Sequence, residues 1–236
     1  MIEIKSLTKD FGKLRAVDNV NLNIKEGECT AILGLNGAGK TTLLSMLSTS
    51  LVPTSGTANV MGLDLNKDKE KIREIINISP QESAVAKNLT VKENLNLIAT
   101  LYNIENKEKR VMEIINEFGL TEKADVLCKR LSGGQMRRLS IALAIITEPK
   151  ILFLDEPTLG LDVKARKLLW DIVEKLKKRM TILLTTHYLE EVEFLADKIA
   201  IMSKGKIKVE GTSDEIKKAT NSKTLEQAFI NLTEEE

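Results

Sequence analysis

The stretch "GLNGAGKTT", residues 34–42, restricts the possible folds of this chain more than any other feature of its sequence. It fits the pattern G-x-x-x-x-G-K-[ST], whose glycines let the backbone wrap closely around a phosphate group. The apolar segment "TAIL" precedes the loop, and a run compatible with a helix follows it. A buried strand, a glycine-rich loop and a helix in this order predict a nucleotide-phosphate site on an α/β core.

The loop offers several kinds of group to a bound triphosphate. Its backbone N–H groups point inward, and the helix that begins near Lys40 adds the positive end of its dipole. The Lys40 ammonium reaches the β- and γ-phosphates, and the Thr41 hydroxyl is suited to ligate Mg²⁺. We therefore expect the following residues to contact the nucleotide: Asn36, Gly37, Ala38, Gly39, Lys40, Thr41 and Thr42.

A pair of acids ends a second apolar segment, "ILFLDE", at residues 151–156. Ligands of parallel α/β sheets bind at the carboxyl ends of the strands, where Asp155 and Glu156 stand. Asp155 is placed to hold the Mg²⁺ shell, and Glu156 beside it to polarise an attacking water. Together with the glycine loop, these acids predict binding of Mg·ATP and its hydrolysis.

Short apolar segments alternate with segments of helical period along much of the chain. The segments "CTAILG" (29–34), "KILFLDE" (150–156) and "MTILLTTH" (180–187) are typical of parallel strands buried on both faces. Between them, "ARKLLWDIVEKLKKR" predicts an apolar helix stripe, formed by Leu168, Leu169, Ile172, Val173 and Leu176. The alternation predicts an α/β fold, a P-loop NTPase core with a mostly parallel sheet flanked by helices.

Two other parts of the chain have a different pattern. "MIEIK" and "NLNI" alternate apolar and polar residues, which predicts an N-terminal antiparallel β portion. Residues 88–130 contain two amphipathic helical patterns and no convincing strand, so we expect a helical subdomain there. We interpret 1–236 as one domain, with a core at about 1–87 and 131–220 and a C-terminal tail at about 221–236.

Charge and apolar content argue against several classes of protein. The net charge is +1, which gives no reason to expect a nucleic-acid partner. The longest apolar runs fall far short of the roughly twenty residues that span a bilayer, and the start, "MIEIKSLTKD", lacks the apolar core of a secretory signal. Cys29 and Cys128 have no metal-binding spacing and indicate reduced thiols. We therefore expect a cytoplasmic protein.

A second glycine turn, "LSGGQ" at residues 131–135, precedes another helical run. Its hydroxyl, its N–H groups and the following helix N-terminus would suit a phosphate, which makes it redundant beside the first loop. A P-loop often receives from another chain a group that stabilises the γ-phosphate during transfer. A two-fold dimer would place each turn, with Ser132, Gly133, Gly134 and Gln135, over the other chain's P-loop, a geometry that the residues of one chain do not fix.

From residue 2 to about residue 232, these segments together resemble the ATP-binding cassette (ABC) family, the nucleotide-binding subunits of ABC transporters. "GLNGAGKTT" is similar to the family's Walker A loop, "ILFLDE" to its Walker B strand, and "LSGGQ" is identical to its signature motif. Further residues resemble the family's adenine-stacking aromatic residue, Q-loop glutamine, D-loop acid and switch histidine, in this order: Phe11, Gln81, Asp162 and His187.

The resemblance implies roles for these residues. Gln81 would sense Mg²⁺ and the transmembrane partner, and the implied metal contacts are Thr41, Gln81 and Asp155. His187 would hydrogen-bond the γ-phosphate and position water, while Glu156 would be the main base and Lys40 would complete the catalytic set. Leu159 stands where many members have a small or hydroxyl residue in the D-loop, which weakens the case for a contact with the neighbouring P-loop.

A cassette of this family that lacks a transmembrane segment would act through a separate permease. The family's docking surface would correspond to residues 81–93, "QESAVAKNLTVKE", and would hold the subunit on the inner face of the cell membrane. Segments such as "LVPTSGTANVMGLDL" and "TLEQAFINLT" resemble exporter-type (ABC-2-like) cassettes.

Three alternatives remain open at this point. One is an importer, and another is a cytosolic cassette ATPase of translation or chromosome maintenance. The third is a regulatory module that binds ATP without turnover. The single cassette and the short separation of Lys40 and Asp155 disfavour the second, and the presence of Glu156 and His187 disfavours the third.

Overall fold

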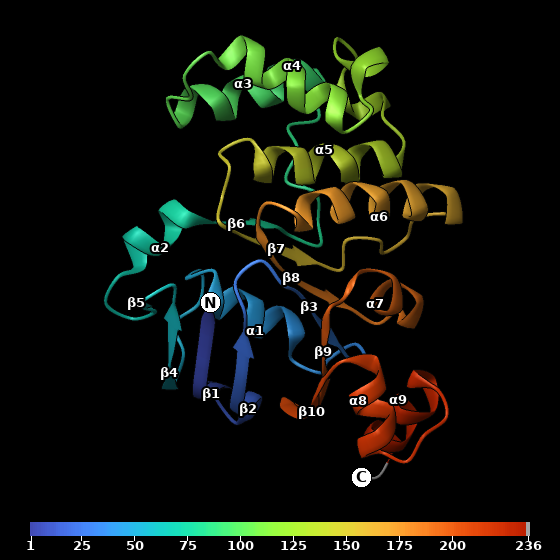
Figure 1. The fold of residues 1–236 in the computed structure, drawn as a ribbon. Helices are drawn as coiled ribbons and strands as arrows, with labels where there is room; N and C mark the ends of the chain where they lie inside the picture. The colour runs from blue at the N-terminus through green and yellow to red at the C-terminus, as the bar shows by residue number, and fades with distance from the viewer. Residues whose placement is uncertain (235–236) are drawn as a thin grey trace.

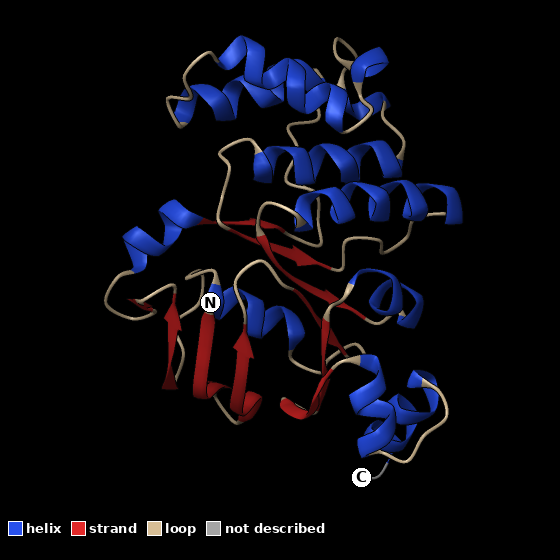
Figure 2. Ribbon diagram, in the orientation of Figure 1, coloured by secondary structure: helices blue, strands red, loops and turns tan. Residues whose placement is uncertain are grey.

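The computed structural model describes residues 1–234 and contains a large and a small β-sheet packed with helices (Figure 1, Figure 2). The strands of the large sheet are β3 (Cys29–Leu33), β6 (Ile76–Ser79), β7 (Ile151–Asp155), β8 (Thr181–Thr186), β9 (Lys198–Ser203) and β10 (Lys206–Gly211). They lie in the order β10-β9-β3-β8-β7-β6, and only the β10–β9 pair is antiparallel among these described strands. The predicted mostly parallel sheet is confirmed.

Side chains of the central strands alternate between two hydrophobic cores, one on each face of the large sheet. On β7, Ile151 and Phe153 enter one core, while Leu152 and Leu154 enter the other. All residues of β3, β7 and β8 are buried, as their continuously apolar sequences predict. Helix α1 (Lys40–Leu47) packs on the first face. The second face is covered by α5 (Gly133–Ile145), α6 (Val163–Lys177) and α7 (Leu189–Leu195).

The small sheet is antiparallel and lies on the other side of α1 from the large sheet (Figure 1). Its strands are β1 (Ile2–Phe11), β2 (Leu14–Ile24), β4 (Ser55–Val60) and β5 (Leu63–Asp64), in the order β2-β1-β4-β5. The register of β1 on β2 pairs Ile2 with Ile24 and Phe11 with Leu14, so the hairpin ends at Phe11. The predicted N-terminal antiparallel portion is therefore present.

Residues 88–130 form the helical region at the top of Figure 1. It contains α3 (Val91–Leu101), α4 (Lys107–Glu117) and two 3₁₀ turns, Thr121–Lys123 and Cys128–Arg130. Helix α2 (Lys69–Ile75) lies between β5 and β6, and α3 and α4 pack against each other. Helix α5 joins this region to the core, because its apolar residues share one core with both α3 and the large sheet.

The structure differs from the sequence prediction at three places. Leu168 was expected in the buried stripe of α6, but it is 51% exposed, because it lies beyond the edge of the face that Leu169, Ile172 and Val173 bury. Strand β6 was not expected. The predicted tail, 221–236, contains helix α9 (Leu225–Glu234), and residues 235–236 of it lie outside the described residues.

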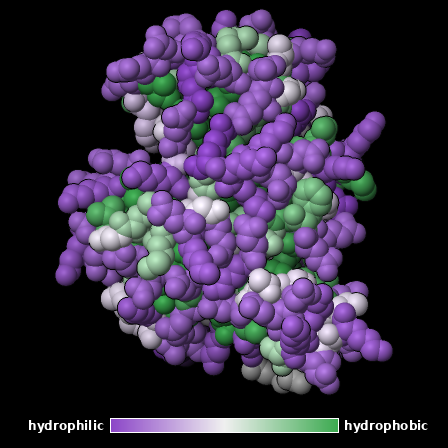
Figure 3. All heavy atoms as spheres, in the orientation of Figure 1, coloured by the Kyte–Doolittle hydropathy of each residue, from purple (hydrophilic) through white to green (hydrophobic). Residues whose placement is uncertain are grey.

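Helix α9 buries Leu225, Ala228 and Phe229 and packs against α8 (Ser213–Ala219) and β9. No helix within residues 1–234 is long and apolar enough to cross a bilayer. The face seen in Figure 3 is mostly hydrophilic, with smaller hydrophobic groups between the polar side chains.

Candidate nucleotide site

The glycine loop between β3 and α1 takes its shape from glycines with positive φ angles. Gly37 has φ +82°, and Gly39, the N-cap of α1, has φ +101°. A Cβ atom on Gly39 would lie 2.4 Å from the carbonyl oxygen of Ala16 on β2, so the loop and the small sheet touch there. The backbone forms a cradle at the N-terminus of α1, where the helix dipole favours an anion.

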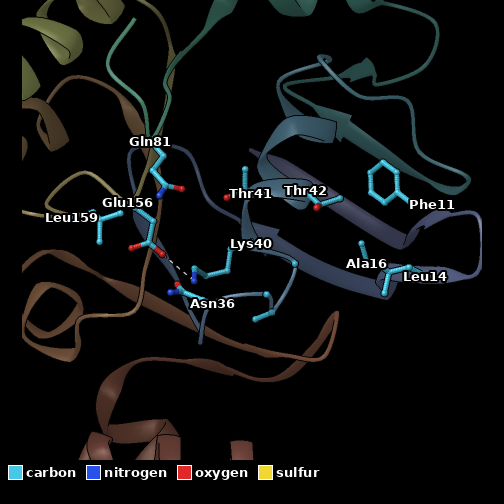
Figure 4. A pocket seen from close by; sticks show the side chains of 13 residues that line it. Phe11, Leu14, Ala16, Asn36, Lys40, Thr41, Thr42, Gln81, Glu156 and Leu159 are labelled. Carbon is cyan, nitrogen blue, oxygen red and sulfur yellow. Dashed lines mark ion pairs between the residues drawn. The ribbon is translucent and has the colours of Figure 1, made fainter.

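A cavity of about 450 Å³ lies along this cradle and extends to the β1–β2 hairpin. Figure 4 shows Phe11 and Leu14 at one end, Gln81 and Glu156 at the other, and Lys40 between them. The volume is that of a small-molecule site. The cavity is lined by Phe11, Leu14, Ala16, Asn36, Gly37, Ala38, Gly39, Lys40, Thr41, Thr42, Gln81, Glu156 and Leu159.

Lys40, Glu156 and His187 form one linked group beside the cradle. The Lys40 ammonium is 2.9 Å from Oε1 of Glu156 and donates to the carbonyl oxygens of Gly34 and Leu35, at 2.7 and 3.2 Å. Oε2 of Glu156 lies 2.8 Å from Nδ1 of His187. Lys40 and Glu156 are each only 5% exposed. The Glu156 carboxylate is thus within hydrogen-bond distance of both the Lys40 ammonium and the His187 imidazole.

Asp155 connects β7 with α1 and β8. Its Oδ1 accepts a hydrogen bond from the Thr41 hydroxyl at 3.1 Å and another from the hydroxyl of Thr185, and the carboxyl is 3% exposed. Thr185 also accepts a hydrogen bond from the backbone N–H of Glu156 at 3.1 Å. The two acids at the end of β7 are therefore both held by β8.

The residues predicted to hold Mg²⁺ present oxygen donors of the kind that this ion prefers. Thr41 and Gln81 line the cavity, and the Thr41 hydroxyl contacts the buried Asp155 carboxylate behind it. Within residues 1–234, no group of three or more His, Cys, Asp and Glu side chains forms a site for a metal. The donor set fits an ion that is bound by one carboxylate and completed by phosphate oxygens and water.

The signature turn does not line this cavity. Ser132 is the N-cap of α5, where its hydroxyl accepts from the N–H of Gln135 at 3.3 Å and its N–H donates to the Gln135 side chain at 3.0 Å. Ser132 and Gly133 are exposed, and Gly134 is half-buried. Asp162 is the N-cap of α6 and accepts from the N–H of Ala165 at 2.9 Å. Each of these predicted site residues thus has a local role as well.

The structure adds residues that the sequence did not single out. Leu14 and Ala16 line the cavity beside Phe11, where an alternating strand pattern gives no sign of a ligand. Thr185 has a possible signal, since it ends an otherwise apolar strand at the ligand edge of the sheet. Arg137 is buried under the site, but two adjacent arginines after "GGQM" look the same in a sequence as a solvated pair.

The profile of the ABC transporter family matches residues 17–159. The daunorubicin/doxorubicin resistance ATP-binding protein DrrA of Streptomyces peucetius is 43% identical over 227 residues, which cover 95% of this chain and 69% of that protein. The probable multidrug ABC transporter ATP-binding protein YbhF of Escherichia coli (strain K12) is 38% identical over 240 residues, which cover 98% of this chain and 41% of that protein. The chain thus spans less than half of the second relative.

Solved structures agree in fold. The structure of an ATP-binding subunit of an ABC transporter superimposes with a TM-score of 0.88 at 29% identity and covers 98% of this chain and 99% of that one. A dimeric post-hydrolysis state of the ATP-binding cassette MJ0796, bound to ADP and Pi, has a TM-score of 0.81 at 30% identity and covers 90% and 98% of the two chains.

Proposed function

We propose that this chain binds and hydrolyses ATP to move a substrate through a separate membrane permease. The premise is that the chain belongs to the ABC transporter family. The observation that carries the proposal is the linked group of Lys40, Glu156 and His187 beside the glycine cradle. Lys40, a cation for phosphates, and Glu156, a carboxylate for a water, line the cavity. The His187 imidazole lines a neighbouring hollow and contacts that carboxylate. Together they are the equipment for phosphoryl transfer to water.

ATP would lie along the cavity with its adenine at the hairpin end. The Phe11 ring is 48% exposed and borders the cavity, so one of its faces is open to stacking. The triphosphate would then occupy the cradle, where the backbone N–H groups and the Lys40 ammonium face its oxygens. Asn36, Thr42 and the other loop residues that line the cavity fit this orientation.

Hydrolysis requires Glu156 to exchange the Lys40 ammonium for a water. When Lys40 turns to the phosphates, Oε1 of Glu156 is free to accept a proton from a water whose oxygen attacks the γ-phosphorus. The bond from the γ-phosphorus to the bridging oxygen breaks, which leaves ADP and phosphate. His187 would donate to the γ-phosphate. Mg²⁺, held by Thr41, Asp155 and Gln81, would supply charge neutralisation at the β- and γ-phosphates.

The signature turn would complete the site of a second copy of this chain. Ser132 and Gly133 lie outside the cavity and are exposed, so within one chain they have no nucleotide to contact. A head-to-tail two-fold dimer would bring Ser132, Gly133, Gly134 and Gln135 over the partner's γ-phosphate, with Asp162 nearby. The dimeric ADP- and Pi-bound state of a similar cassette supports this arrangement.

The permease would dock between the helical region and the core, which places the subunit on the inner face of the cell membrane. A second cavity, of about 160 Å³, lies there between β6, α3 and α5, next to the predicted docking segment 81–93. Its apolar lining includes Ile78, Ala84 and Leu143. Tyr102, the C-cap of α3, also lines it and is exposed, as is Leu101 beside it. An apolar hollow with an exposed apolar rim is typical of a protein-binding site.

Export is the direction that the relatives favour. The name of DrrA attributes drug resistance to it, and that of YbhF gives a probable multidrug transporter. Resistance by transport requires outward movement of the drug, so we propose that this chain also powers export.

The mass of the Glu156→Gln protein in solution, with and without ATP and Mg²⁺, tests the proposal. Without its base, the site should hold ATP unhydrolysed, and the mass should change from monomer to dimer only when nucleotide is present. The same variant with Lys40→Ala is the control and should remain a monomer. If Glu156→Gln protein binds ATP and stays monomeric, the homodimer is wrong, and if it does not bind ATP, the nucleotide site itself is wrong.

A further inference from the structure

Arg137 is a buried arginine that bonds to backbone carbonyls of two segments around the site, 80–81 and 155–157. It is 5% exposed. Its Nε donates to the carbonyl oxygen of Pro157 at 2.8 Å, and its Nη2 donates to that of Asp155 at 2.7 Å. Its Nη1 donates to the carbonyl oxygen of Pro80 and, at 3.4 Å, to that of Gln81. All three nitrogens of the guanidinium are therefore used on main-chain oxygens.

The bonded carbonyls lie where the regular strands stop. β6 ends at Ser79, immediately before Pro80 and Gln81, and β7 ends at Asp155. Beyond a strand end the backbone has no ladder to satisfy its oxygens, and buried carbonyls need another donor. The planar guanidinium has five N–H donors on three nitrogens, so it can bond to carbonyls that lie on different sides of it.

Burying this cation without an ion pair is costly, and burial lowers the pKa of Arg137 to about 10. The group still carries its proton at neutral pH, so the hydrogen bonds to the carbonyls have to offset its desolvation. An apolar side chain would fill the same space in α5 without this cost. The bonds therefore hold the segments 80–81 and 155–157 firmly to α5.

We propose that Arg137 is a positioning residue that fixes the Gln81 backbone against the end of β7 and against α5. Arg137 stands little more than one helical turn from Gly133, the first residue of α5. A single rigid turn thus connects the segment that carries Gln81 with the signature turn at Ser132. The inference rests on the proposed function in one respect, that Gln81 serves a site that binds Mg·ATP.

Arg138, the next residue, supplies a matched control. Its Nη1 donates to the carbonyl oxygens of Phe118 and Gly119, at 2.7 and 3.1 Å, at the end of α4 in the helical region. Burial lowers the pKa of Arg138 as well, so both arginines are partly desolvated cations that bond to carbonyls. They differ in which carbonyls they hold, since Arg138 does not reach the segment at Gln81.

Hydrogen exchange of the nucleotide-free protein tests the positioning role without turnover. Arg137→Lys keeps the charge but has three donors on one nitrogen, which cannot reach the carbonyls of both segments as the guanidinium does. Amides of residues 81–84 should exchange about tenfold faster in Arg137→Lys than in the unsubstituted protein. Arg138→Lys should leave residues 81–84 unchanged and accelerate exchange near Gly119. Arg137→Met is the second variant, to be used if the lysine protein does not fold.

Nucleotide affinity measured with Mg²⁺ and with a chelator provides the second measurement. In Arg137→Lys, the gain in ATP affinity that Mg²⁺ gives should fall about tenfold, because Gln81 is no longer held in place, whereas the affinity in chelator should be unchanged. Unchanged exchange at residues 81–84 in a folded Arg137→Lys protein would overturn the inference, as would an equal effect of Arg138→Lys there. If the unsubstituted protein binds no ATP, the proposed function fails, but the exchange result still decides the role of Arg137.

Discussion

Glu191 is a buried carboxyl group on α7, the helix that follows β8. It is 0% exposed, and its Oε1 accepts a hydrogen bond from Nε1 of Trp170 at 3.2 Å. Burial raises the pKa of this carboxyl, and the negative charge of Glu156 adds to the effect. The group is therefore a neutral acceptor at acidic pH, and its ionisation works against the fold.

The pH dependence of stability follows from this raised pKa. Between the ordinary pKa of a glutamate and the raised pKa of Glu191, the folded protein binds more protons than the unfolded chain, so the unfolding free energy falls as pH rises. Glu191→Gln keeps an oxygen for Trp170 and cannot ionise. Its melting temperature relative to that of the unsubstituted protein should therefore rise as the pH increases above the ordinary pKa of a glutamate.

The neighbouring Glu190 is the control, since its side chain is 77% exposed. Glu190→Gln should follow the pH profile of the unsubstituted protein. Identical profiles for Glu191→Gln and the unsubstituted protein would contradict the raised pKa.

Substitutions at Gly39 and Gly37 separate two effects on stability, a steric clash with β2 and backbone strain in the loop. Both have positive φ, but a Cβ on Gly39 would meet the Ala16 oxygen at 2.4 Å, whereas a Cβ on Gly37 would meet nothing within 4 Å. Gly37→Ala should lower the unfolding free energy by about 1–2 kcal/mol through backbone strain alone. Gly39→Ala should lower it by about 3 kcal/mol or more, because backbone has to move. Urea denaturation measures both, and equal losses would show that the loop and β2 are not in contact.

The N-terminus of α5 combines two tasks at the scale of the helix. Ser132 caps α5 through the reciprocal bonds with Gln135, and we propose that it also faces the neighbour's γ-phosphate. Asp caps a helix about as well as Ser, and its charge suits the helix dipole. Ser132→Asp should therefore change the unfolding free energy by less than about 0.5 kcal/mol, yet it should lower ATP turnover about 100-fold by repelling the neighbour's phosphate.

Helix α8 provides the same cap away from the site. Thr212 caps α8 through reciprocal bonds with Glu215. Thr212→Asp therefore makes the same kind of cap substitution at a helix with no nearby nucleotide. It should leave both stability and turnover unchanged. A Ser132→Asp protein of normal stability and normal turnover would exclude the shared site.

The sequence predicts an element well when the interactions that form it lie within a short stretch of chain. The unit formed by β3, the glycine loop and α1 is predicted because its signals lie within a short stretch of chain. Strand β6, "INIS", has only four residues and alternates with Asn77 and Ser79, and it is a strand because it pairs with β7. The role of Arg137 is missed for the same reason. Its partners, Pro80 and Asp155, are distant in sequence, so no spacing indicates them.

Under the proposed function, the distribution of site residues over the molecule would give one chain two half-sites. The cavity gathers Phe11, Lys40 and Glu156, while Ser132 lies outside it at the exposed N-terminus of α5. The sequence predicts both halves but not their separation, which depends on how α5 and the helical region pack on the core. In a two-fold dimer, each complete site would take Lys40 and Glu156 from one copy and Ser132 from the other.

Mixing two inactive variants tests this distribution. Dimers of Lys40→Ala alone, or of Ser132→Asp alone, have a defect in both sites. A mixed dimer has both defects in one site, and its other site combines the intact Lys40 of one copy with the intact Ser132 of the other. A mixed dimer still binds ATP at its intact site, which can hold the two copies together. If copies pair at random at equal concentrations, half of the dimers are mixed and each has one intact site, so ATP turnover should recover to at most about a quarter of the unsubstituted level.

The control mixes Lys40→Ala with Glu156→Gln, whose defects lie in the same half-site. Every site in that mixture lacks either Lys40 or Glu156, whichever copies pair, so turnover should not recover. Recovery in the first mixture alone is expected only if the signature turn acts on the neighbour's nucleotide. Were Ser132 to act on the ATP of its own chain, each copy would retain its own defect, and neither mixture would exceed the sum of its separate components.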